Sequence, residues 1–159
     1  MSGRPPDGSE KAKMPVSTRA MSIEDYEAVH SLWLAIPGIG LNESDTRTAT
    51  EAFLGRNPGM SAVAFEGTQL VGAVLCGHDG RRGYLHHLAV SAAWRGRGIA
   101  RLLLARCFDR LSACGIPKCN IFLFSDNAEG AAFWLHNGWS ERSDLQVLQK
   151  PVAPRRAAA

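Results

Sequence analysis

A strand that leads through a glycine-containing turn straight into an amphipathic helix is the feature that most constrains how this chain folds. The residue pattern predicts the strand over 83–90, the turn over 91–98 and the helix over 99–114. Apolar residues recur on one face of the helix: Ala100, Leu103, Leu104, Cys107, Phe108, Leu111 and Cys114. Gly115 caps its end, and Pro117 prevents its continuation. Because the apolar face must be buried, this unit predicts a helix packed on a sheet.

The residues before this unit predict an antiparallel meander with two helices. The expected elements are a strand over 16–20, a helix from Ser22 with Asp25 in the capping-box position, a helix capped by Ser44 or Asp45 that ends near Gly55, and hairpin strands over 61–66 and 69–77. Asp79 and Gly80 form a typical hairpin turn before the next strand. These strands therefore pair with their neighbours in sequence.

The residues after the unit predict a crossover to a further strand and a small C-terminal addition. Residues 118–124 are almost continuously apolar, which is typical of a strand buried on both faces. A helix capped by Asn127 or Asp126 follows to about His136, and short strands are expected over 139–143 and 145–150. The sum is a mixed, mostly antiparallel α/β sheet with helices on both faces.

Composition and charge favour one soluble domain over residues 15–150. Residues 1–14 and 151–159 are rich in small, polar or charged residues, and we expect both to be disordered tails. The net charge is +3, but the tails carry +1 and, from residue 150 onward, +3, which leaves the body slightly acidic. This distribution argues against a nucleic-acid partner.

The chain has no apolar run long enough for a membrane helix, and no secretory signal is visible at its start, so a cytoplasmic location is expected. The four cysteines contain no C-x-x-C pair and no zinc-like pairing with histidine, so we expect reduced, mostly buried thiols and no metal site. Of these, Cys76 precedes a glycine at the end of an expected strand and keeps a residual interest as a reactive thiol.

The turn over 91–98 carries the chemistry that can be inferred from residue types alone. The first turn of a helix presents unpaired N–H groups and partial positive charge. Gly96 and Gly98 remove the Cβ atoms that would hold an anion away, and Arg95, Arg97 and Arg101 add full positive charge. The segment matches neither a nucleotide P-loop nor a dinucleotide fingerprint. We interpret it as a diphosphate site at a helix N-terminus, with a solvated glycine turn as the alternative.

Two motifs in this order resemble the GNAT superfamily of N-acetyltransferases. The first comprises Leu88-Ala89-Val90 followed by Arg95-x-x-Gly98-x-Ala100, and the second comprises Asn127, Ala131, Phe133 and Gly138-Trp139. Residues 71–83 are similar to a small, poorly characterised bacterial branch of that superfamily. The resemblance covers residues 15–150 and implies the GNAT fold, in which the fourth and fifth strands splay apart.

The resemblance also implies a cofactor site for acetyl-CoA. Backbone groups of Leu88, Ala89 and Val90 would pair with the pantetheine arm, and Asn127 would contact it as well. The pyrophosphate would be held by the backbone of Arg95, Gly96, Arg97, Gly98, Ile99, Ala100 and Arg101. Acetyl-CoA would serve as acetyl donor without a metal.

The proton-transfer groups typical of these enzymes are missing from the matching positions. Trp134 occupies the position of the usual tyrosine acid, and Phe122 that of a frequent glutamate base. His86 and His87 are weak candidates for a base, and because they are adjacent on a strand we expect them to face opposite sides of the sheet. Two further pairs, His78 with Asp79 and Glu43 with Asp45, are expected in a solvated turn and in helix capping.

The sequence thus predicts an N-acetyltransferase that transfers an acetyl group directly from acetyl-CoA to a primary amine, in a small molecule or at a peptide or protein N-terminus. Without an obvious base, an α-amine of low pKa is the favoured acceptor. The alternatives are a non-catalytic acyl-CoA-binding or sensing module and an interaction protein that has lost the cofactor. The resemblance leaves a homodimer open, since many relatives pair through their last strands, and no membrane partner is expected.

Overall fold

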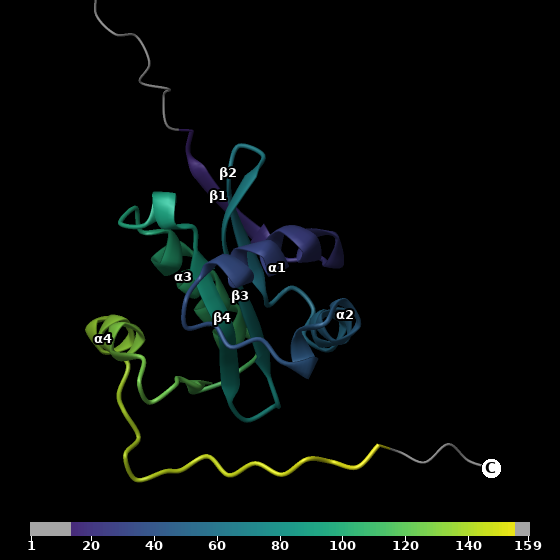
Figure 1. Ribbon diagram of the computed structural model, residues 1–159, viewed down its shortest axis with the longest axis vertical. Helices are drawn as coiled ribbons and strands as arrows, with labels where there is room; N and C mark the ends of the chain where they lie inside the picture. The colour runs from purple at the N-terminus through teal and green to yellow at the C-terminus, as the bar shows by residue number, and fades with distance from the viewer. Residues whose placement is uncertain (1–13, 155–159) are drawn as a thin grey trace, which may run out of the picture. The chain divides into compact units, whose positions relative to one another are not determined.

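The computed structural model describes residues 14–154, which fall into two compact units divided after Phe122. The first unit contains a five-stranded sheet in the order β1-β2-β3-β4-β5 (Figure 1). Its strands are β1 (Val16–Ala20), β2 (Ala62–Glu66), β3 (Gln69–His78), β4 (Gly83–Val90) and β5 (Cys119–Ile121). The first four are antiparallel to their neighbours, and β4 pairs with β5 in parallel. The expected mixed, mostly antiparallel sheet is confirmed.

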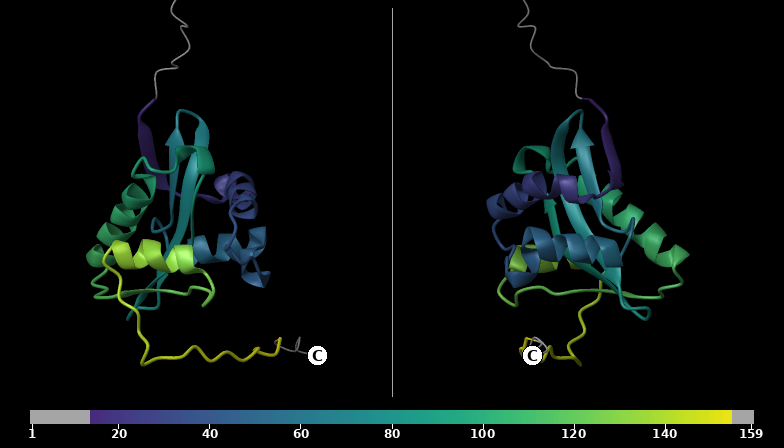
Figure 2. Two further views of the ribbon diagram at one scale, coloured as in Figure 1. Left: turned by 60° about the vertical axis from the view of Figure 1, so that its left-hand side comes forward. Right: turned by 90° about the vertical axis from the view of Figure 1, so that its right-hand side faces the viewer.

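Helices cover both faces of this sheet, as the sequence predicts. Figure 2 shows α1 (Tyr26–Ala35) and α2 (Arg47–Arg56) on one face and α3 (Ile99–Ala113) on the other. On the first face Val29 and Trp33 of α1 are buried against the sheet residues Ala73 and Ala89. On the second face the buried residues of α3 are Ile99, Leu103, Leu104, Cys107 and Leu111. Phe108 and Cys114, both expected on this face, are exposed.

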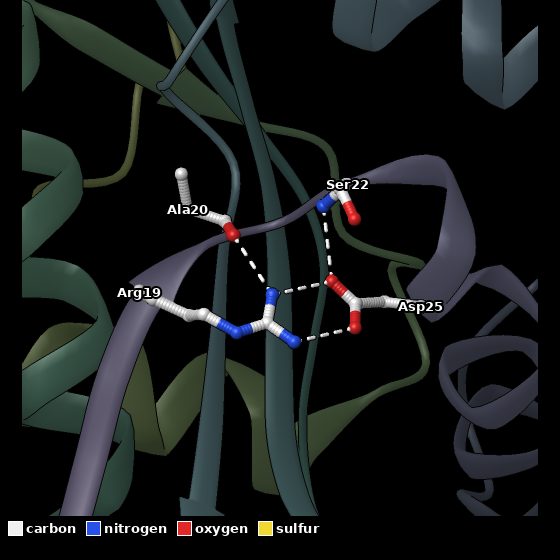
Figure 3. Close-up of polar contacts among 4 residues, drawn as sticks. All are labelled: Arg19, Ala20, Ser22 and Asp25. Atoms are coloured by element: carbon white, nitrogen blue, oxygen red, sulfur yellow. Dashed lines mark hydrogen bonds and ion pairs between the residues drawn. The ribbon is translucent and has the colours of Figure 1, made fainter.

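The connection from β1 to α1 is fixed by one carboxylate. Asp25 receives two hydrogen bonds from the Arg19 guanidinium, at 2.7 and 2.8 Å, and one from the backbone N–H of Ser22 at 2.9 Å (Figure 3). The capping box expected from Ser22 and Asp25 is therefore present. The guanidinium lowers the pKa of Asp25 through these hydrogen bonds. This contact joins the end of β1 to the turn that leads into α1.

The second helix begins differently from the prediction. Asn42 caps a single 3-10 turn, Glu43–Asp45, and Thr46 caps α2 by accepting a hydrogen bond from Ala49 at 3.1 Å. Neither Ser44 nor Asp45 is the N-cap of α2. The prediction failed because several cap-type residues stand next to one another, and the 3-10 turn uses the first of them.

A bulge in β4 separates this strand into two parts. Ala73 pairs with Ala89 and Leu75 with His86, so β4 has one residue more than β3 between these pairs. His87 takes up the extra residue with a φ of 53°, and no other described residue except glycine has a positive φ. Beyond Leu85 the pairing with β5 ends. The splay expected between the fourth and fifth strands therefore lies at this bulge.

The C-terminal unit, residues 123–154 of the described chain, contains one helix, α4 (Ala128–His136). Asn127 caps it, as predicted, by accepting a hydrogen bond from the Gly130 amide at 2.9 Å. The strands predicted over 139–143 and 145–150 are absent from the described residues. The segment instead contains a local ion pair between Arg142 and Asp144 and a turn from Arg142 to Leu145.

The predicted strand over 118–124 is also shorter and less buried than expected. β5 keeps only three residues, and Phe122, Leu123 and Phe124 are exposed. A run of apolar residues indicates burial only where elements cover both faces, and that condition is not met here. Most of the expected tails, 1–13 and 155–159, lie outside the described residues. Among the described helices, none is both long and apolar enough to cross a membrane.

Candidate functional site

The segment from Gly96 to Arg101 presents a row of uncommitted backbone amides at the start of α3. Within the described residues, the amides from Gly96 to Arg101 donate no hydrogen bond, whereas Arg95 donates to Ala92 and Leu102 donates to Gly98. Gly96 and Gly98 both have φ near 75°, a conformation that glycine adopts without strain. No atom lies within 4 Å of a Cβ placed on either glycine, so their faces are open. The geometry is that of an anion site at a helix N-terminus.

The arginines of this segment have different roles. The Nη1 atom of Arg97 donates to Glu66 on β2 at 3.1 Å, and the indole Nε1 of Trp94 donates to the same carboxylate oxygen. These contacts, that of Trp94 first, lower the pKa of Glu66. Arg95 and Arg101 are exposed, and the structure gives neither of them an ion pair with a described residue. Arg97 thus fixes the turn, while Arg95 and Arg101 keep their charge available.

The free edge of β4 adjoins this anion site. Ser91 donates to Val71 on β3 at 2.8 Å. Because backbone groups alternate along an antiparallel strand, the N–H and C=O groups of Val90 and Leu88 point away from β3 and those of Ala89 point toward it. The pairing with β5 has already ended at Leu85. Leu88 and Val90 therefore offer hydrogen-bonding groups to an extended ligand.

His86 and His87 lie on the same face of the sheet, so the expectation of opposite faces was wrong. The ring of His86 makes an edge contact with Phe53 of α2, with centroids 5.9 Å apart, and the ring of His87 contacts Trp33 of α1 in the same way at 5.0 Å. The two imidazole centroids are 6.5 Å apart. Both α1 and α2 cover one face. The positive φ of His87 breaks the alternation on which the prediction rested.

Of the two histidines, only His87 has a carboxylate partner among the described residues. Nε2 of His87 lies 2.8 Å from Oδ1 of Asp45, and both side chains are largely buried. His86 instead stacks near Tyr84 and Phe122. Burial, and then the neighbouring His87, lower the pKa of His86. The pairing of Asp45 with His87 could not be found from the sequence position of Asp45, because it stands among residues typical of helix caps.

The remaining candidates are structural. His78 accepts a hydrogen bond from the Gly80 amide, and Asp79 accepts from the amides of Arg81 and Arg82, so both form the expected hairpin turn. Glu43 is exposed in the 3-10 turn. Contact with Cys107 and burial raise the pKa of the Cys76 thiol, which makes a thiolate role at this position unfavourable.

In the C-terminal unit, the Trp134 indole makes edge contacts with Phe133 and Trp139, with centroids 5.2 and 4.8 Å apart. Asn127 uses its side-chain oxygen to cap α4. The two residues therefore have structural partners inside their own unit. Trp134 has an N–H that can donate a hydrogen bond but does not ionise near neutral pH.

The strands β4 and β5 splay apart next to the start of α3, where backbone amides are free to donate hydrogen bonds. These two features place the chain in a class of α/β proteins suited to extended, anionic ligands. Residues 26–139 match the model of the acetyltransferase (GNAT) family. A protein of Pectobacterium atrosepticum named as an acetyltransferase is 36% identical over 108 residues, which cover 65% of this chain and 73% of that protein. The chain belongs to the GNAT acetyltransferase family, and it is an acyltransferase.

Solved structures show the same fold. The crystal structure of Ard1 from Thermoplasma volcanium superposes with a TM-score of 0.71 at 16% identity, over 80% of this chain and 84% of that one. PaiA N-acetyltransferase from Thermoplasma acidophilum, solved in complex with coenzyme A, has a TM-score of 0.69 at 19% identity, over 80% of this chain and 91% of that one. The fold class predicted from the sequence is therefore confirmed.

Proposed function

We propose that this protein is an N-acetyltransferase that uses acetyl-CoA and transfers the acetyl group directly to a primary amine in a ternary complex. The proposal depends on the backbone amides from Gly96 to Arg101, which donate no hydrogen bond to a described residue. They follow β4, whose outer edge is free beyond Leu85. A diphosphate suits the first feature, and an extended amide-bearing arm suits the second. Both ligand parts occur in coenzyme A in this order.

The described residues fit this donor. The amides from Gly96 to Arg101 would hold the pyrophosphate, and the charges of Arg95 and Arg101 would add to their field. The outward backbone groups of Leu88 and Val90 would pair with the pantetheine amides as an added strand. Backbone N–H groups near the bulge would polarise the thioester carbonyl. Asn127 remains a proposed pantetheine contact from the family resemblance.

A primary amine is the proposed acceptor, with an α-amine preferred over a lysine side chain. An α-amine has a pKa of about 7.7–8.0 and a lysine amine one of about 10.4, so the α-amine loses its proton far more readily near pH 7. Positioning the amine against the carbonyl would supply much of the rate enhancement. The indole of Trp134 cannot act as proton donor to the departing thiolate, so solvent would take this part.

The donor half of the proposal is tested with a truncated substrate. S-acetylpantetheine carries the thioester and the pantetheine arm but lacks the diphosphate and the nucleotide. If the turn binds the diphosphate, its KM as donor should exceed that of acetyl-CoA by about 100-fold or more, because several charge-assisted hydrogen bonds are lost. Equal KM values for the two donors would refute the site.

A matched pair of variants tests the same point on the protein. Arg101→Gln in the first turn of α3 should weaken acetyl-CoA binding about tenfold in calorimetry. Arg56→Gln removes an equally exposed charge from the end of α2 and should leave the affinity unchanged. Acetyl-CoA-dependent thiol release that requires an added amine then distinguishes a transferase from a protein that only binds the donor. Thiol release that no amine stimulates would contradict the proposed transfer.

A further inference from the structure

The contact between His87 and Asp45 is unusual because it joins residues of distant elements at the bulge of β4. Nε2 of His87 and Oδ1 of Asp45 are 2.8 Å apart, with 17% of the imidazole and 6% of the carboxylate exposed. His87 directly precedes Leu88, the first residue of the free edge. A partly accessible histidine with a buried carboxylate behind it therefore lies where the proposed donor site begins.

The carboxylate of Asp45 is fixed by its own surroundings. Its second oxygen, Oδ2, accepts a hydrogen bond from the backbone N–H of Asn42 at 2.9 Å, and its backbone carbonyl accepts one from the Tyr26 hydroxyl at 2.6 Å. A carboxylate can only accept, so in the neutral imidazole Nε2 carries the hydrogen. The other ring nitrogen of His87, Nδ1, then has a free lone pair that can take a proton.

We propose that His87, held in this tautomer by Asp45, is the general base that takes a proton from the acceptor amine. The inference rests on the proposed N-acetyltransferase function. It names a general base, which the positions that match the GNAT family do not supply. Trp33 fixes the ring from the side, with its centroid 5.0 Å from that of the imidazole and only 1% of its surface exposed. A fixed ring and a fixed tautomer are what proton transfer requires.

The proposed reaction begins with the protonated acceptor amine. The ammonium group of the acceptor gives one proton to Nδ1 of His87, and the neutral nitrogen attacks the thioester carbonyl. The carbon–sulfur bond breaks, the sulfur leaves with the bonding electron pair, and the second proton of the attacking nitrogen is passed to that sulfur through solvent. His87 returns its proton to solvent. The products are the acetylated amine, the free thiol and one proton.

The titratable groups around His87 favour it over its neighbour. Asp45 faces it from the 3-10 turn before α2, His86 precedes it on β4, and Tyr26 of α1 lies behind Asp45. His86 has no hydrogen-bonded carboxylate among the described residues, and its lowered pKa makes it a weaker proton acceptor. Asp45 fixes the tautomer of His87 through the contact at Nε2, a support that His86 lacks among the described residues.

The test is the pH dependence of kcat/KM in His87→Asn. Asparagine tolerates the positive φ of this position better than most residues, so the bulge is retained. In the wild type, the low-pH limb should lie well below the pKa of the acceptor amine, because His87 takes the proton from the ammonium group. In the variant only the neutral amine reacts, so the midpoint should move up to the pKa of the acceptor itself.

The size of the defect should depend on pH and on the acceptor. For an α-amine with a pKa of about 8, roughly one tenth is neutral at pH 7, so the variant should lose about tenfold there and regain wild-type rates above pH 9. For an ε-amine with a pKa of about 10.4, roughly one part in 2500 is neutral at pH 7, so the loss there should exceed 1000-fold. A loss that is equal at every pH would indicate a structural role and overturn the proposal.

Two further variants and one binding measurement make the result specific. His86→Asn should leave the midpoint of the limb where it is in the wild type, and Asp45→Asn should lower kcat/KM because Nε2 of His87 loses the partner that fixes the tautomer. A midpoint that moves with His86→Asn and not with His87→Asn would overturn the assignment. Calorimetry with acetyl-CoA separates the proposed function from the proposed base. If His87→Asn binds acetyl-CoA normally and its midpoint does not move, the role of His87 is refuted and the proposed function is not. Absence of acetyl-CoA binding in the wild type would contradict the proposed function.

Discussion

The packing of α3 on the sheet depends on Gly72 in β3. Replacing this glycine tests how closely the helix and the strand pack. A Cβ atom at Gly72 would lie 3.1 Å from Cγ2 of Ile99, 3.1 Å from Cδ1 of Leu103 and 3.2 Å from the backbone oxygen of Ala89. All three distances are shorter than ordinary van der Waals contacts. Ile99 is the first residue of α3, so the contact reaches the start of the proposed anion site.

Two opposing effects decide the sign of Gly72→Ala. Restricting the unfolded chain stabilises an alanine variant by about 0.4–1 kcal/mol, whereas overpacking a core costs about 1–3 kcal/mol. At this site the backbone oxygen cannot move away, and Ile99 and Leu103 are both at most 1% exposed. Overpacking should therefore dominate, with a net loss of about 1–2 kcal/mol and a fall in Tm of about 3–6 °C.

A double-mutant cycle with Leu103→Ala examines the cause. Leu103→Ala alone should cost about 2–5 kcal/mol through the cavity it leaves. In the Gly72→Ala background the added methyl group has room, so the double variant should be more stable than the sum of the single changes by about 1 kcal/mol. Gly55→Ala in α2 is the control, because a Cβ atom placed there has no atom within 4 Å. This change should stabilise the folded protein by about 0.5–1 kcal/mol. A stabilising Gly72→Ala with no coupling to Leu103 would refute the packing argument.

Two further predictions concern the carboxylates of Glu66 and Asp25. Glu66→Gln should weaken acetyl-CoA binding several-fold in calorimetry, because the charge that orders Trp94 and Arg97 is lost; unchanged affinity would show that the turn is ordered without it. Asp25→Asn should lower Tm at neutral pH and not at acid pH. The pKa of Asp25 is lowered in the folded state, so its contribution is present above about pH 4, the ordinary pKa, and disappears as the pH falls through the folded pKa. Melting curves from pH 2 to 7 would count against this if the difference between the two proteins did not vary.

The elements around the proposed donor site could be predicted because local signals agree there. The bounds of β4 match those expected, and α3 ends within a residue of the expected position. Both elements combine hydrophobic periodicity with glycine or turn signals at their ends, so no distant contact is needed to place them. The opening of the first helix at Ser22 follows from the same agreement between a cap and a periodic apolar face.

The strands expected at the C-terminal end could not be predicted correctly because a strand depends on a partner. Residues 139–150 have the composition of short strands, but a strand forms only where another strand offers its edge. β5 ends at Ile121, and the following apolar residues are exposed. The helical cap at Asn127 was found correctly because it needs only the amide of Gly130, three residues away.

The φ angle of His87 explains why the alternation of side chains along a strand gave a wrong prediction for the candidate base. Alternation along a strand assigns adjacent residues to opposite faces, and by this rule only one of His86 and His87 could reach the cleft. The positive φ at His87 adds a residue to β4, so the strand shifts its register against β3, and the side chains of both histidines reach the face covered by α1 and α2. The same irregularity lies just beyond the last residue paired with β5 and leaves the edge of Leu88 and Val90 free. The bulge therefore determines where an extended donor can bind and which imidazole meets Asp45, so a change that restored regular pairing at His87 should remove both properties together.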